Sequence, residues 1–99
     1  MKMTFVVYNE YVDRQVMALL EAQNIDYYTR WENVKGKGHG TEPHMGSGGY
    51  AATNFVLMIA FSEDAPLHGL IAAIKAVNDK TQRSDERIRL FQMPMELMV

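Results

Sequence analysis

The feature of this sequence that most constrains its fold is an apolar run within residues 54–61, NFVLMIAF. Its length suits a β-strand, and apolar residues occupy both its even and its odd positions. A strand in a sheet with one solvated face alternates apolar and polar residues, so both faces of this strand must be covered. Helices of the same chain can cover one face. We expect a second copy of the chain to cover the other, because soluble monomers rarely expose so large an apolar patch.

Three further segments have the composition of β-strands. Residues 4–8, 27–34 and 87–93 are rich in β-branched or aromatic residues, or alternate apolar with polar ones. Together with residues 54–61 they predict four strands.

Apolar residues at helical spacing predict two helices between these strands. The first begins at Asn9, a good N-cap, ends near Gln23, and is stopped by Asn24. The second begins at Asp64 and gives way to a polar connector at residues 78–86. The order βαββαβ predicts an α+β, ferredoxin-like fold, in which a four-stranded antiparallel sheet carries both helices on one face.

A long glycine-rich loop separates the second and third predicted strands at residues 35–53. It contains six of the seven glycines and two of the three histidines. Loops longer than about 12–15 residues inside compact domains are usually functional or disordered. We therefore expect a mobile loop that carries the function. Just before it, Tyr27, Tyr28 and Trp31 either pack across strands or flank a ligand cleft at the loop base.

Composition excludes several classes of function. The chain has 99 residues, no cysteine and a formal net charge of −2. This length predicts a single domain over residues 1–99, and the absence of cysteine excludes disulfides and thiol catalysis. The charge argues against a nucleic-acid partner. No apolar run is long enough to span a bilayer and no signal-peptide core is present, so we expect a cytoplasmic protein without direct membrane insertion.

Three segments of the chain carry a resemblance to a known family. Residues 34–38 (VKGKG) end a strand and open the long loop, LLEAQNI (residues 19–25) ends the first helix, and SDERIRLF (residues 84–91) leads into the last strand. With the order of elements, these segments resemble the PII family of nitrogen regulatory signal-transduction proteins over nearly the whole chain. The resemblance implies a ferredoxin-like homotrimer whose sheets face inward. It also implies a non-catalytic protein that binds adenine nucleotides between subunits and signals to a target protein, such as a membrane transporter, through its T-loop.

The chain departs from the family pattern at several places, two of which bear directly on the ligand site. Gly40 stands where the family has a glutamine that helps bind 2-oxoglutarate with Mg-ATP. Residues 84–87 replace a glycine-rich phosphate-binding turn that ends in lysine. Arg87 supplies a cation at that end, whereas Asp85 and Glu86 repel phosphate. The resemblance thus implies a ligand or nucleotide site formed by Gly36, Lys37, Gly38 and Arg87.

The loop also contains the one cluster of side chains with metal-ligand chemistry. Imidazole and carboxylate groups suit zinc, copper or nickel, and the cluster consists of His39, Glu42 and His44. The spacing H-x-x-E-x-H is not a specific metal signature. A metal-responsive protein that uses these residues is our alternative function, and a ferredoxin-like interaction module without a ligand is a third.

A second set of candidate ligands lies near the C-terminus. Methionines at positions 93, 95 and 98 offer thioethers to Cu(I), which is a soft ion. Methionine is also an adaptable filler of cores and interfaces, and packing is the alternative use of these side chains.

The sequence shows no pattern of catalytic residues. It lacks a Ser/His/Asp set and paired carboxylates at a defined spacing, and the loop glycines match no P-loop. We therefore expect a binding protein and not an enzyme.

Overall fold

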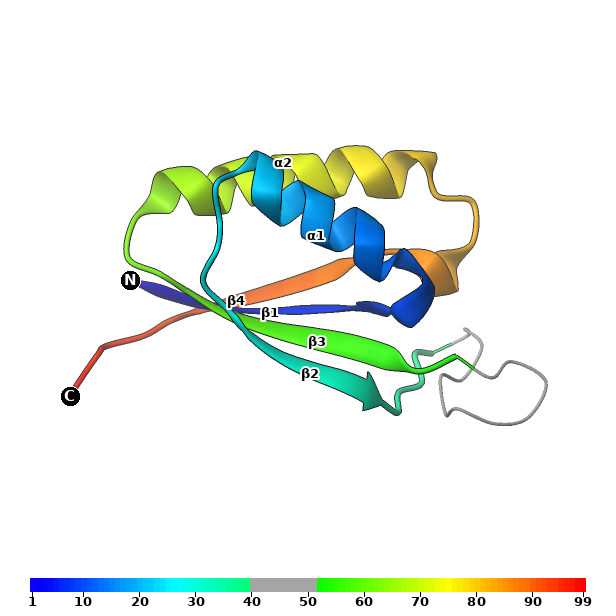
Figure 1. Ribbon diagram of the computed structural model, residues 1–99, viewed down its shortest axis with the longest axis horizontal. Coiled ribbons are helices and arrows are strands. Elements are labelled where there is room, and N and C mark those ends of the chain that lie inside the picture. The colour runs from blue at the N-terminus through cyan, green and yellow to red at the C-terminus, as the bar shows by residue number, and fades with distance from the viewer. Residues whose placement is uncertain (40–51) are drawn as a thin grey trace.

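The chain forms a four-stranded antiparallel sheet with both helices on one face (Figure 1). This computed structural model describes residues 1–39 and 52–99. The strands are β1 (Lys2–Asn9), β2 (Thr29–Val34), β3 (Asn54–Phe61) and β4 (Arg89–Pro94), in the spatial order β2-β3-β1-β4. The helical elements are the 3-10 turn η1 (Glu10–Val12), α1 (Asp13–Ala22), α2 (Asp64–Lys80) and the 3-10 turn η2 (Ser84–Glu86). The predicted ferredoxin-like fold is confirmed.

Helix α1 begins and ends where capping residues allow it. The Asn9 side chain accepts a hydrogen bond of 2.9 Å from the backbone N–H of Tyr11, so Asn9 caps the turn η1 and the regular helix starts later, at Asp13. Asn24 adopts φ = 56°, the left-handed conformation that stops a helix and that asparagine tolerates. The stop at Asn24 is confirmed, whereas Asn9 caps the preceding turn and not α1 itself, whose N-cap Val12 makes no side-chain hydrogen bond.

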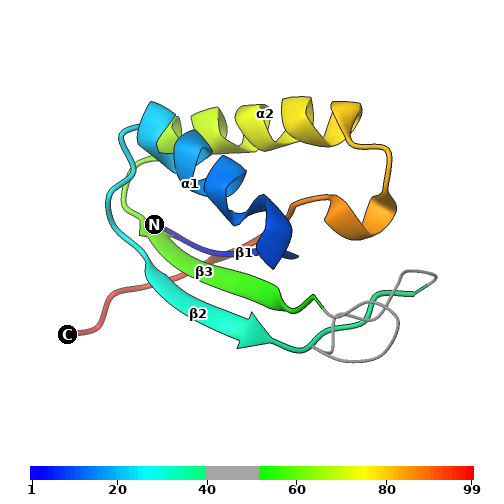
Figure 2. The ribbon, with the colours of Figure 1, turned by 45° about the vertical axis from the view of Figure 1, so that its right-hand side comes forward.

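The hydrophobic core lies between the sheet and the helices. In β3 the odd positions face the helices, and the exposed fraction of their side chains is 8% or less; these residues are Phe55, Leu57, Ile59 and Phe61. Leu20 of α1 and Leu70 of α2 cover them from above. Figure 2 shows that no element within the described ranges lies against the other side of the sheet.

That other side, which we call the open sheet face, carries apolar side chains from all four strands, with Thr29 of β2 and Arg89 of β4 at its edges. Trp31 and Phe91 are 44% and 57% exposed there, whereas the residues of the two central strands are partly buried by their neighbours. The strand registers place these side chains together on the face: Met3, Phe5, Val7, Trp31, Val56, Met58, Phe91 and Met93. The apolar character of β3 on both faces, predicted from its sequence, is thus shared by the neighbouring central strand β1.

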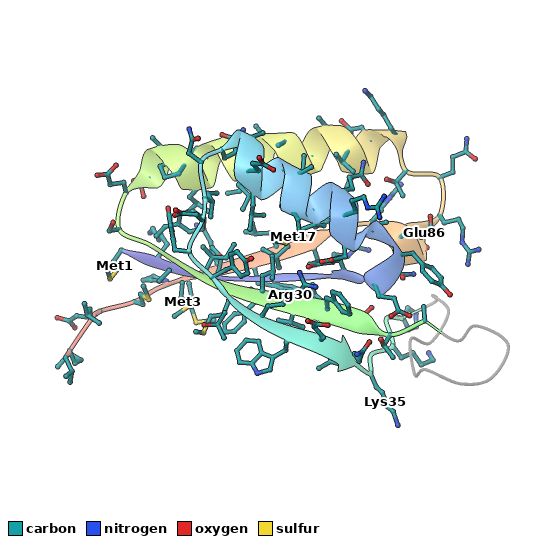
Figure 3. The ribbon with its side chains drawn as sticks, in the orientation of Figure 1. Met1, Met3, Met17, Arg30, Lys35 and Glu86 are labelled. Atoms are coloured by element: carbon teal, nitrogen blue, oxygen red, sulfur yellow. The ribbon has the colours of Figure 1, made fainter. Side chains whose placement is uncertain are left out.

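A polar network joins the first helix to two strands beneath it. The Tyr8 hydroxyl donates a hydrogen bond of 2.7 Å to Asp13 Oδ1, and Arg30 Nη2 lies 3.3 Å from Asp13 Oδ2. The Arg30 guanidinium also lies 4.9 Å from the centre of the Phe55 ring, which is the distance of a cation–π contact. Burial, together with the hydrogen bond to Asp13, raises the pKa of Tyr8. The network fixes α1 to β1 and to the edge strand β2 (Arg30 in Figure 3).

A single side chain connects the end of α2 to the segment before β4. Asn78 Nδ2 donates to the carbonyl oxygen of Ile88 and Asn78 Oδ1 accepts from its N–H, both at 2.8 Å. Helix α2 runs on to Lys80, so the predicted start of the connector at residue 78 is three residues too early. The hydrogen bonds of Asn78 to a distant residue hold it at this position.

Two other boundaries differ slightly from the prediction. Strand β2 begins at Thr29 and not at Tyr27. Tyr27 lies outside the strand because its ring packs edge-on against Phe61, with the ring centres 5.9 Å apart. Strand β4 covers Arg89–Pro94, two residues later than expected at its start. Within the described residues, no helix combines the length and apolarity needed to cross a bilayer.

We predict that Asn78→Ala lowers the free energy of unfolding by about 1–3 kcal/mol, because it leaves the N–H and C=O of Ile88 without their partner. Asp79→Ala, at the exposed neighbouring position, is the control with a similar gain in helix propensity. Urea unfolding of the three proteins measures the difference. Equal stability of the two variants would contradict a stabilising role for the Asn78 side chain.

We predict that Tyr8→Phe lowers the free energy of unfolding by about 1–3 kcal/mol, because Asp13 loses a hydrogen-bond donor. It also removes a pH dependence. The pKa of Tyr8 is raised in the folded state, so above about pH 10, where tyrosine ionises in an unfolded chain, only the unfolded state releases this proton and stability falls. Urea unfolding from neutral to alkaline pH checks both effects. Tyr11→Phe, at a side chain that is 66% exposed, should keep the alkaline loss of stability.

A candidate ligand site at the base of the loop

The end of β2 is bent by a β-bulge just before the loop begins. Trp31 pairs with Val56 and Val34 pairs with Asn54, so β2 has one more residue than β3 between these two pairs. Asn33 lies within this interval at φ = 57°. A bulge bends its strand and increases its twist, and this one directs the chain away from the sheet edge as it enters the loop.

The returning end of the loop is fixed by hydrogen bonds to two elements. Thr53 accepts a hydrogen bond from the N–H of Glu10 at 3.0 Å, and its own N–H donates to Glu10 Oε1 at 3.3 Å. The Thr53 hydroxyl donates to Asn33 Oδ1 at 3.1 Å. Ala52 is fully buried. The two ends of the loop are therefore held to each other and to the turn η1.

A hollow of about 460 Å³ lies on the open sheet face at this loop base. Phe5 of β1 and Val56 of β3 form part of its apolar lining, and Trp31 of β2 lines it as well. Lys35 and Gly36 line the hollow where the loop leaves the strand. Lys35 is exposed and extends away from the helices in Figure 3. The hollow thus combines an apolar surface, one indole ring and one cation.

Gly36 lies close to the side chain of Asn54 at the start of β3. A Cβ atom at this position would lie 2.5 Å from Nδ2 of Asn54, a separation that real Cβ atoms do not show. A larger residue would have to displace the Asn54 side chain at the edge of the hollow. Glycine is therefore the residue that lets the backbone lie against this part of β3.

The predicted ligand residues are only partly brought together in one chain. Gly36 lines the hollow. Lys37 and Gly38 follow it in exposed positions, and Lys37 Nζ contacts the carbonyl oxygen of Gly38 at 3.5 Å. Arg87 is exposed after η2 and leads into β4, which is the sheet edge opposite to β2.

Arg87 nevertheless lies at the same end of the sheet as the loop. In β1, Val7 pairs with Arg89 of β4, and Asn9, two residues further along β1, pairs with Asn54 at the start of β3. Figure 2 shows the turn η2 and the loop base at the same end of the molecule. Within one chain, Arg87 and Gly36 therefore lie at opposite edges of the sheet, separated by its width.

The predicted metal cluster lies mostly outside the described residues. His39 is described and exposed, whereas Glu42 and His44 fall between residues 40 and 51. Within the described part of the chain, no three histidine, aspartate or glutamate side chains gather as metal ligands do.

Two residues of the hollow were not fully identified from sequence. Two roles of Trp31 are predicted, and the structure agrees with both, because Trp31 pairs with Val56 across the strands and also lines the hollow beside the loop base. Tyr27 packs on Phe61. Lys35 lies within the VKGKG segment, and its position directly after the apolar Val34 is a usable signal for a cation at the strand end.

Comparison with known proteins identifies the fold. No protein-family model and no curated protein matches the sequence. Among solved structures, the chain is similar to CPII from Thiomonas intermedia K12 bound to ADP and bicarbonate, with a TM-score of 0.68 and 15% identity over 93% of this chain and 84% of that one. It is also similar to CPII, described as a nitrogen regulatory PII-like protein, bound to ADP, AMP and bicarbonate, with a TM-score of 0.63 and 15% identity over 99% and 94% of the two chains.

The resemblance predicted from the VKGKG segment and the order of elements is confirmed in three dimensions. Both similar structures are matched along most of their length by strands and helices in this arrangement. The chain therefore has the fold of a nitrogen regulatory PII-like protein.

Proposed function

We propose that this protein is a divergent PII-like regulator of the cytoplasm that senses an adenine nucleotide and has no catalytic activity of its own. The observation that carries the proposal is the hollow at the loop base, which places Trp31, Lys35 and Gly36 together on this fold. Its volume of about 460 Å³ lies within the range of small-molecule sites. The similar protein CPII is described as bound to ADP, AMP and bicarbonate, which supports the same class of ligand here.

The chemistry of the hollow suits the two parts of a nucleotide. The exposed indole of Trp31 offers a flat surface on which a nucleobase can stack, and such stacking contributes about 1–3 kcal/mol per base. Lys35 and the following Lys37 supply cations for phosphate, and the glycine backbone between them offers N–H groups without a side chain in the way. Arg87 is the further cation at this end of the sheet.

Assembly explains how Arg87 reaches the site. In a closed ring, an edge of one subunit meets a different edge of the next. If the β4 edge of a second copy lies beside the β2 edge of the first, Arg87 of that second copy approaches Gly36, Lys37 and Gly38. The complete site then lies between subunits.

The same assembly covers the open sheet face. Phe91 is 57% exposed in the isolated chain, and apolar side chains of all four strands lie on this face. A homotrimer with its sheets turned inward buries the part of the face around Phe91, leaves the hollow beside Trp31 at its margin, and keeps α1 and α2 outside. The loop at residues 35–53 then lies at the subunit boundary, where a bound nucleotide shifts it between conformations that a target protein, such as a transporter, distinguishes.

We predict that ADP, AMP or ATP binds the assembled protein and changes the fluorescence of Trp31. The chain contains one tryptophan and this residue lines the hollow, so a stacked base alters its emission directly. Calorimetry gives the affinity, and titrations with and without bicarbonate compare the effect of a second ligand. No heat and no fluorescence change with any of the three nucleotides would contradict the proposal.

Charge variants locate the phosphate group in the same titrations. Lys35→Glu should weaken nucleotide binding by about tenfold or more, because an anion replaces the cation beside the phosphate. The matched control is Lys80→Glu at the exposed end of α2, which should bind as the unaltered protein does. Equal affinity of the two variants would place the ligand elsewhere.

We predict that light scattering after size-exclusion chromatography gives three times the chain mass. Phe91→Glu, at the most exposed aromatic side chain of the open sheet face, should yield a folded species of lower mass because it introduces a charge into the apolar interface. Ala18→Glu, at an exposed position of α1, is the control and should remain trimeric. A monomeric parent protein at micromolar concentration would exclude the assembly.

A further inference from the structure

Four of the eight methionines of the chain lie on β1 and β4 or directly beside these strands, at the end of the sheet opposite the loop base. Met3 of β1 and Met93 of β4 are direct partners in the antiparallel register. Lys2 and Pro94 form the next pair in that register. Beyond this pair, the Met95 N–H donates a hydrogen bond of 3.2 Å to the carbonyl oxygen of Met1. The backbone therefore places two methionine pairs two residues apart. We call Met1, Met3, Met93 and Met95 the methionine cluster.

The alternation of the strands places Met3 and Met93 on the open sheet face. Thr4, beside Met3, is fully buried on the helix side. In β4, Leu90 packs against the core, so Met93 lies on the opposite side. Met3 extends away from the helices in Figure 3.

The spacing of the cluster allows its sulfur atoms to converge. Directly opposed residues in an antiparallel pair have Cβ atoms about 4.5–5.5 Å apart. Methionine is unbranched and has three rotatable bonds beyond this point. Three or four thioethers from adjacent strand positions can therefore approach one point without movement of the backbone.

Exposure distinguishes this cluster from core packing within one chain, and packing at the interface of the proposed trimer is the competing use of these side chains. Met1 and Met93 are each 47% exposed, so neither side chain fills the interior of the isolated chain. Met17, by contrast, packs against the hydrophobic core from α1. The chain has no cysteine, so thioethers are its only sulfur ligands.

We propose that the methionine cluster binds a monovalent soft metal ion, with Cu(I) as the expected ion. Thioether sulfur is a soft, neutral donor that favours Cu(I) over harder divalent ions, which prefer nitrogen and oxygen. The site is separate from the nucleotide site, because it lies at the end of the sheet from which both chain termini emerge, whereas the loop lies at the other end (Figure 1). In a trimer, the clusters of the three copies lie at the same end of the assembly.

The decisive experiment replaces sulfur without changing hydrophobic volume. The intact protein is titrated anaerobically with Cu(I) in competition with a chromophoric Cu(I) chelator, and Ag(I) serves as a probe that does not change its oxidation state. The double variant Met3→Leu/Met93→Leu keeps apolar side chains of similar size and should lose saturable binding. Met17→Leu on α1 is the matched control and should bind Cu(I) as the unaltered protein does.

Two further measurements distinguish thioether binding at the cluster from Cu(I) bound by nitrogen elsewhere in the chain. X-ray absorption of the Cu(I)-loaded protein should show sulfur as the bound neighbour, and a first shell of nitrogen would overturn the proposal in favour of the histidines. Met95→Leu lies beyond the end of β4 and should weaken binding while leaving the circular dichroism spectrum unchanged, which tests the cluster even if the double variant fails to fold. Cu(I) affinity that is unchanged in both cluster variants would also overturn it.

Discussion

Strand β3 is apolar on both faces, and the two helices of the chain cover only one of them. Leu57 and Ile59 are fully buried beneath α1 and α2, which is the arrangement expected for a two-layer domain of this size. Val56 and Met58 lie on the other face beside Phe5 and Val7 of β1. Neither helix can reach that side of the sheet as well. The need to cover this face links the local pattern of one strand to the proposed assembly and, through it, to a site shared between copies.

The rigid part of the molecule fixes the positions from which the loop begins and ends. The Tyr8–Asp13–Arg30 network holds β2 against the first helix. The bulge around Asn33 sets the direction of departure, and the hydrogen bonds of Thr53 set the direction of return. A ligand in the hollow would contact Gly36 and Lys35 within this fixed frame. Lys35 and Gly36 are themselves the first residues of the predicted loop, so no further element would lie between such a ligand and the loop.

Local sequence signals identified most of the fold. The apolar run 54–61 predicted β3 with its observed bounds, because Asn54 and the polar residues after Phe61 delimit it. Asn24 marked the end of α1 through a conformational preference of its own backbone. The start of β2 and the end of α2 were misplaced by two and three residues, because the ring of Tyr27 and the amide of Asn78 find partners far along the chain. Patterns among neighbouring residues carry no signal of such partners.

The candidate site was only partly predictable for a related reason. Gly36 could be found from sequence, since a glycine at the end of a strand signals close backbone approach. Trp31 could be assigned to the cleft only when the register showed which face it occupies. The relation between Arg87 and the loop base depends on which sheet edges meet, and a single chain does not contain that contact.

The sheet ends in two unlike edges, and this has a consequence for growth. Because β2 and β4 are different strands, the contact between them in the proposed assembly would be head to tail, and it would close into a ring or continue as a filament. Strand edges with unpaired backbone N–H and C=O groups favour the filament. Here Pro94 removes one backbone donor from β4, and the extra residue in β2 interrupts its ladder. Both features hinder strand-by-strand polymerisation through continuous backbone pairing, so the proposed contact between copies has to come mainly from side chains of the open sheet face.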